Sequence, residues 1–83
     1  MPGPADPADL AGLCRRIDDH EYGRRVVPTH REDVDRLREI GNVANSRGGF
    51  PAMLALAQQA AGQYRNALNT TNMHWSGIGE WQS

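Results

Sequence analysis

Residues 51–69, PAMLALAQQAAGQYRNALN, carry the widest helical pattern of apolar residues in this 83-residue chain. Pro51 suits the first position of a helix, where a missing amide proton costs nothing. Apolar residues recur at three- and four-residue intervals, which places them on one face. Many are alanines, so a neighbouring helix can approach closely, and we expect this helix to form the centre of the fold. The predicted face comprises Met53, Leu54, Leu56, Ala57, Ala60, Ala61, Tyr64, Ala67 and Leu68.

Another helix, the first along the chain, is predicted over residues 7–21. Asp6 is a good N-cap, Pro7 suits the first helical position, and Gly23 is a suitable stop. Its apolar residues share one face and are Leu10, Leu13, Cys14 and Ile17. Because Cys14 lies on this face, it is interpreted as a small core side chain rather than a reactive thiol.

A third helix is predicted over residues 29–47, between the other two. Thr29 and Glu32 have the spacing of a capping box, in which each side chain bonds the backbone amide of the other residue. Val34, Leu37, Ile40 or Gly41, and Ala44 form a narrow apolar stripe, and Gly48-Gly49 ends the helix.

These patterns predict one all-α domain over residues 1–83, a small three-helix bundle with a Trp-containing C-terminal tail. Residues 1–6 are expected to form a flexible N-terminus, residues 7–69 the three helices, and residues 70–83 the tail. The links between the helices are short, which favours antiparallel neighbours. Gly77 and Gly79 argue against a regular helix in the tail.

The tail is the most informative segment for function. Both tryptophans lie in the last nine residues, and two interpretations stay open. The tail folds back and caps the small core, or the tail and the uncharged face of the helix over 51–69 dock a protein partner, since Trp and Tyr are common at interface hot spots. The candidate protein-binding residues are Tyr64, Leu68, Met73, Trp75, Ile78 and Trp81.

The charges divide the chain into two unequal parts. Residues 1–47 hold eight arginines and nine acidic residues, whereas residues 48–83 hold only Arg65 and Glu80. Surfaces of soluble domains normally carry mixed charge, so the second part is expected to be buried or covered. Leu, Val, Ile and Phe together number only 14, which leaves a lone chain of this length marginally stable.

The basic residues are all arginine, with no lysine, which indicates a high-GC genome such as that of an actinobacterium or its phage. The chain has one cysteine and therefore no internal disulfide. No segment is long and apolar enough to cross a membrane, and the N-terminus does not resemble a signal peptide, so a cytoplasmic protein is expected.

No catalytic or metal-binding constellation stands out. In Asp18-Asp19-His20-Glu21, only Asp18 and Glu21 would converge on a helix, which is too few ligands for a divalent ion. The acidic residues of this run are expected to neutralise most of the charge of Arg15-Arg16 and Arg24-Arg25. The protein is therefore predicted to be no enzyme and to hold no metal or cofactor.

Three classes of function remain open. The leading expectation is a small protein-interaction module, such as a phage or actinobacterial modulator that binds a host or cellular protein. The second is a DNA-binding regulator, because the segment 57–68 loosely resembles a helix-turn-helix around Gly62. A net charge of −1 disfavours nucleic acid, and a continuous helix through Gly62 is preferred. The third is a structural homo-oligomer that buries its uncharged half.

Overall fold

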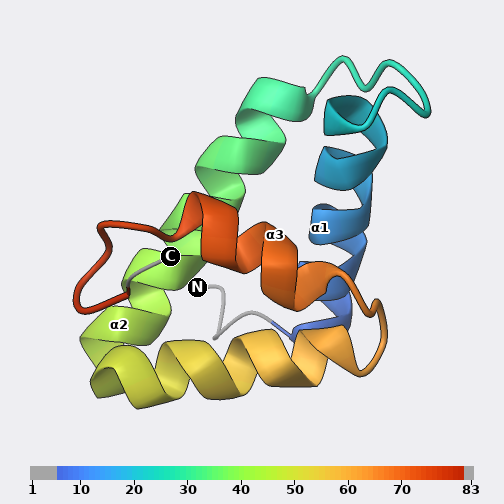
Figure 1. The fold of residues 1–83 in the computed structure, drawn as a ribbon. Helices are drawn as coiled ribbons and strands as arrows, with labels where there is room; N and C mark the ends of the chain where they lie inside the picture. The colour runs from blue at the N-terminus through green and yellow to red at the C-terminus, as the bar shows by residue number, and fades with distance from the viewer. Residues whose placement is uncertain (1–5, 82–83) are drawn as a thin grey trace.

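The computed structural model describes residues 6–81, and these residues form an all-α fold, as predicted (Figure 1). The helices are α1 (Pro7–Glu21), α2 (His30–Ala61) and α3 (Ala67–His74). Together they enclose a single hydrophobic core. The flexible N-terminus predicted over residues 1–6 lies outside the described residues, except for Asp6, and so do the last two residues of the tail.

The first helix follows its sequence signals closely. The carboxylate of Asp6 accepts a hydrogen bond from the amide of Ala8 at 3.0 Å, and Pro7 opens the helix. The four residues of the predicted face, Cys14 included, are buried. This agreement is expected, because a capped amphipathic helix depends on contacts within a few residues.

The second helix bends sharply, which gives it a first arm (residues 30–47) and a second arm (residues 50–61). Gly49 adopts φ 67° and ψ −158°, a conformation that suits glycine, so the predicted break at the glycine pair is confirmed. The predicted capping box is wrong. Thr29 makes no side-chain bond to the helix backbone, and its hydroxyl instead donates to the carboxylate of Asp33 at 3.2 Å.

The continuous helix predicted over residues 51–69 is also wrong. The second arm ends at Ala61, residues 62–66 form turns, and α3 begins at Ala67. At this turn Tyr64, Asn66 and Thr70 all donate hydrogen bonds to the buried carboxylate of Asp18. In an unbroken helix, residues 64 and 66 would point about 160° apart and could not both reach one carboxylate, so this network requires the turn.

The tail folds back onto the core, as the first interpretation predicted. Trp75, Ile78 and Trp81 are each at most 4% exposed, and the two indoles meet edge to face at 5.1 Å. Gly77 and Gly79 have positive φ and let the chain turn after α3. The predicted start of the tail at residue 70 is corrected, since α3 continues to His74.

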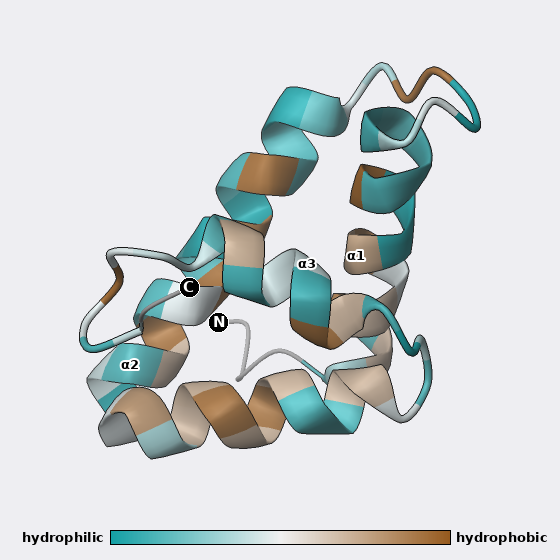
Figure 2. Ribbon diagram, viewed as in Figure 1, coloured by the Kyte–Doolittle hydropathy of each residue, from teal (hydrophilic) through white to brown (hydrophobic). Residues whose placement is uncertain are grey.

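The short helix α3 packs against α1 and α2, and in Figure 1 it is seen between α1 and the second arm of α2. Hydropathy differs strongly along the chain (Figure 2). The second arm is mostly apolar, whereas the first arm is largely hydrophilic. Among residues 6–81, no helix is long and apolar enough to cross a membrane.

Candidate functional site: a groove and a pocket beside α3

An apolar groove of about 550 Å³ lies between the second arm of α2 and α3. Phe50 and Leu54 come from the second arm, Leu68 from α3, and Trp81 from the tail. Leu68 is 37% exposed, a large fraction for a leucine, while Phe50 and Leu54 are only partly buried. Among residues 6–81, the lining of what we call the apolar groove is Phe50, Leu54, Arg65, Leu68, Asn69, Asn72 and Trp81.

Trp81 is an unusual component of this lining. Its indole nitrogen is buried, yet no residue between 6 and 81 accepts a hydrogen bond from it. By contrast, the indole nitrogen of Trp75 donates to the backbone oxygen of Leu37 at 2.8 Å. A buried polar group without a partner typically costs about 1–3 kcal/mol. The tail is therefore held at the groove by apolar contact, including the ring of Phe50 at 5.4 Å, and not by this donor.

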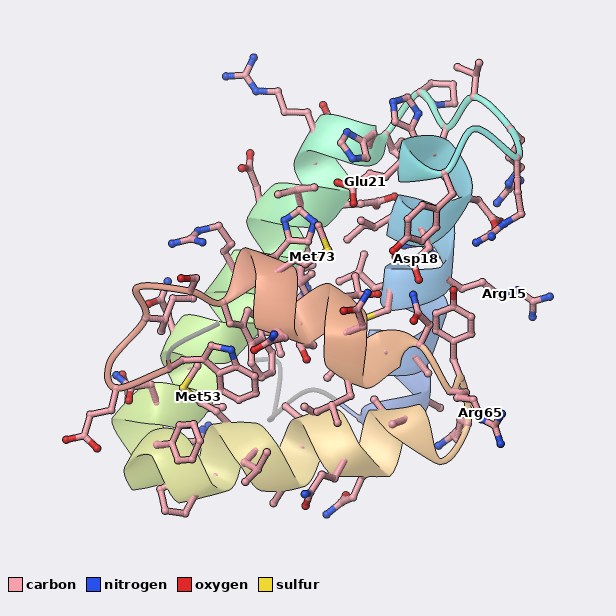
Figure 3. All side chains as sticks on the ribbon, viewed as in Figure 1. Arg15, Asp18, Glu21, Met53, Arg65 and Met73 are labelled. Carbon is pink, nitrogen blue, oxygen red and sulfur yellow. The ribbon has the colours of Figure 1, made fainter. Side chains whose placement is uncertain are left out.

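A second hollow, of about 450 Å³, adjoins the groove through Arg65, which lines both. Arg15 and Arg65 extend from the same edge of the molecule (Figure 3). Neither guanidinium has a hydrogen bond or ion pair with any other residue in the described range of 6–81. The lining of what we call the arginine pocket is Arg15, Asp19, Arg24, Gln63, Tyr64 and Arg65.

The expected neutralisation of the arginine pairs is only partly correct. Asp19 binds both Arg24 at 2.9 Å and Arg25 at 3.3 Å, and the Arg24 hydrogen bond is the main cause that lowers the pKa of Asp19. Asp18 and Glu21, however, are directed elsewhere in the fold. Asp33 instead pairs with Arg16 at 3.3 Å, so of these four arginines Arg15 alone keeps no acidic partner among residues 6–81.

Asp18 is the most buried charged residue, at 1% exposure. It accepts hydrogen bonds from Tyr64 at 2.5 Å, Asn66 at 2.8 Å and Thr70 at 2.8 Å. Burial, and next the hydrogen bond to Asp18, raise the pKa of Tyr64 to about 12. The network joins α1 to the turn before α3, so it fixes the position of one wall of each hollow.

Glu21 holds two of the three histidines. Its carboxylate lies 3.0 Å from Nε2 of His30 and 3.1 Å from Nε2 of His74. His20 stacks on His30 with ring centroids 4.2 Å apart. The Nδ1 atom of His20 accepts a hydrogen bond from the amide of Val27. His74 thus packs on the body of the protein, and the cluster anchors the end of α3 to the link between α1 and α2.

The lone cysteine, Cys14, is buried in the core. Burial raises the pKa of the Cys14 thiol to about 12, so the thiol stays protonated at neutral pH. Within residues 6–81, no three His, Cys, Asp or Glu side chains are grouped so that they could hold a metal ion.

The structure divides the six predicted binding residues into two groups. Trp75, Ile78 and Trp81 are buried in the chain's own core, although Trp81 also borders the groove. The other three have exposed surface: Leu68 lines the groove, Tyr64 lines the arginine pocket, and Met73 is 57% exposed.

Sequence reasoning missed most of the lining residues. Phe50, Asn69, Asn72 and Arg65 carried no separate signal, because their meeting depends on the bends at Gly49 and Gly62. Arg15 and Arg65 are 50 positions apart, and no local pattern links them.

Comparison with protein-family models, with curated proteins and with solved structures finds no match to this chain. Its function is therefore argued from the two hollows and the side chains that line them.

Proposed function

We propose that the protein is a small non-enzymatic interaction module that binds a protein partner in the apolar groove. The observation that carries this proposal is the concave surface of about 550 Å³, which is lined by the partly exposed Leu68 together with Leu54 and Phe50. An apolar groove between two helices is a common receptor for an amphipathic segment of another protein. Asn69 and Asn72 also line the groove, and side-chain amides at such contacts can bond a partner backbone.

The low charge of this half of the chain supports the same proposal. Only Arg65 carries a formal charge among the groove residues, so covering the floor requires the desolvation of few charges. Binding would displace water from leucine and aromatic surface, which is the main source of affinity at such contacts.

The proposal is tested with a photo-crosslinking residue placed at Leu68 in the source cell. Val43, which is 38% exposed and does not line the groove, is the matched control position. We expect a discrete covalent product with another protein from position 68 and none from position 43. The same products from both positions would contradict the proposal, and a product containing only this chain would favour the homo-oligomer.

DNA binding is the second candidate, and the bend in the chain favours it. The second arm, the turn at residues 62–66 and α3 follow one another as helix, turn and helix, an order that the sequence reading had disfavoured. Salt distinguishes the two functions, because affinity for a phosphate backbone falls steeply as salt rises. A shallow salt dependence would support the protein-binding groove.

A further inference from the structure

We propose that the partner segment is acidic as well as apolar, with a bulky apolar side chain in the apolar groove and a carboxylate in the arginine pocket. This inference rests on the proposed function and adds the chemistry of the partner. It assigns the arginine pocket as the second half of one continuous binding surface.

The continuity of the surface comes from Arg65. This residue lines both the groove and the pocket, so the two hollows meet at Arg65. Leu68 lies three residues further along, at the start of α3, and faces the groove. A carboxylate and an apolar side chain about one helical turn apart on a partner would reach these two positions together.

The charge of the pocket is unbalanced. Arg15, Arg24 and Arg65 line it, and Asp19 is the only acid in its lining. Asp19 is already bonded to Arg24 and also to Arg25. Two of the three lining arginines, Arg15 and Arg65, therefore have no partner among residues 6–81.

The pocket lining is therefore positively charged, whereas the whole chain has a net charge of −1. A localised positive edge on a slightly acidic protein attracts acidic partners while the rest of the surface does not. Guanidinium groups also bind carboxylates through paired hydrogen bonds, which adds geometric selectivity.

Phosphate would satisfy the same arginines, so nucleic acid must be compared. A nucleic-acid backbone is charged throughout and would leave the floor of Phe50, Leu54 and Leu68 without an apolar counterpart. An acidic, apolar peptide segment matches both hollows at once, and for this reason the observations favour it.

The test is a peptide-display selection from a random library against the full-length protein. Parallel selections use Arg15→Gln/Arg65→Gln, Leu68→Asp, and Arg31→Gln as the matched control. Arg31 is an exposed arginine in the first turn of α2, and it lines neither hollow. Thermal melts of each variant confirm that it is folded before the selection is read.

We expect enriched peptides in which an acidic residue lies about one helical turn from a Leu, Phe or Trp. Leu68→Asp should abolish enrichment, and Arg31→Gln should leave it unchanged. The double variant should still select apolar residues but lose the acidic preference, with affinity for a wild-type-selected peptide reduced roughly two- to fivefold per arginine.

The outcomes separate the two proposals. Apolar peptides without an acidic preference would overturn this inference and leave the groove as a protein-binding site. No enrichment, or enrichment insensitive to Leu68→Asp, would overturn both. Tight binding of a duplex DNA probe that the double variant loses, with a steep salt dependence, would also overturn both and assign the arginine pocket to nucleic acid.

Discussion

The two sides of α3 are built in opposite ways. On the closed side, Asp18 is fully surrounded by donors, and the indole of Trp75 is bonded to Leu37 and packed on Gly41. On the open side, Leu68 is partly exposed and the indole donor of Trp81 has no acceptor within the described chain.

The difference separates stability from recognition. Buried polar groups with complete partners hold one structure, because any alternative leaves a donor or acceptor unpaired. A partly exposed apolar surface adds little to folding and is available to a partner. Residues on the closed side are therefore expected to contribute most to the free energy of unfolding. Residues on the open side are expected to contribute most to binding.

The largest effect is expected from Asp18→Ala. This change leaves the donors of Tyr64, Asn66 and Thr70 without their shared acceptor in a buried site. The free energy of unfolding should fall by about 3 kcal/mol, measured by urea denaturation. Asp19→Ala, at a solvent-exposed carboxylate, should cost clearly less, and equal losses in the two variants would contradict the distinction between the network and its neighbour.

A second loss is expected from Gly41→Ala on the closed side. A methyl group at position 41 would lie 2.7 Å from Nε1 of Trp75, so the indole or the first arm must shift. Overpacking of this kind typically costs about 1–3 kcal/mol, and the thermal midpoint should drop accordingly. Gly12→Ala is the control, since a methyl group there meets no atom within 4 Å, and it should not lower the midpoint.

The paired changes Trp75→Phe and Trp81→Phe compare the two indoles directly. The first removes the bond to the buried oxygen of Leu37 and should destabilise by about 1–3 kcal/mol. The second removes a donor that has no acceptor, so its loss of packing is partly offset and its cost should be smaller. Chemical denaturation of both variants measures the difference, and a larger cost for Trp81→Phe would refute this account.

The smallest effect is expected at alkaline pH. The pKa of Tyr64 is raised from 10.0 to about 12, so the folded state holds this proton more tightly than the unfolded state. The stability from this linkage is complete below pH 10 and is lost as pH rises from 10 to about 12. The pKa of Cys14 is likewise raised, from 9.0 to about 12, so ionisation of its thiol also lowers the stability as pH rises above 9.

Tyr64→Phe isolates the tyrosine contribution. Unfolding by urea at about pH 8 and about pH 11 should give a smaller alkaline loss in the variant than in the wild type, because the phenol can no longer ionise. An unchanged loss would assign the alkaline sensitivity to other groups, Cys14 among them.

Local signals predicted much of the fold. Three features were predictable because each depends on residues within a few positions. They are the cap at Asp6, the apolar face of α1 and the break at Gly48-Gly49. The helix over 51–69 was predicted incorrectly because Gly62 is tolerated in a helix on local grounds alone. The turn coincides with the hydrogen bond from Tyr64 to Asp18, 46 positions earlier, a contact that no local pattern indicates.

The candidate site was predictable only in part. Leu68 and Tyr64 were chosen for their place on an uncharged face, and the structure puts them in adjoining hollows. The unpaired state of Arg15 was not predicted, because neighbours along the chain do not show which carboxylate pairs with which arginine. In the fold, Asp18 and Glu21 turn to α3 and to histidines, while Arg15 keeps no partner among residues 6–81.

The sequence by itself determined the helical class, the first helix, the bend at the glycine pair and the uneven distribution of charge. These follow from periodicity, capping and glycine conformation, which act over a few residues. Tertiary structure decided where the second arm ends, which tryptophan finds a hydrogen-bond acceptor, and which arginines have no ion-pair partner among residues 6–81. Those outcomes depend on buried groups that pair across the fold, so they are set by the packing of α3 between α1 and the second arm of α2.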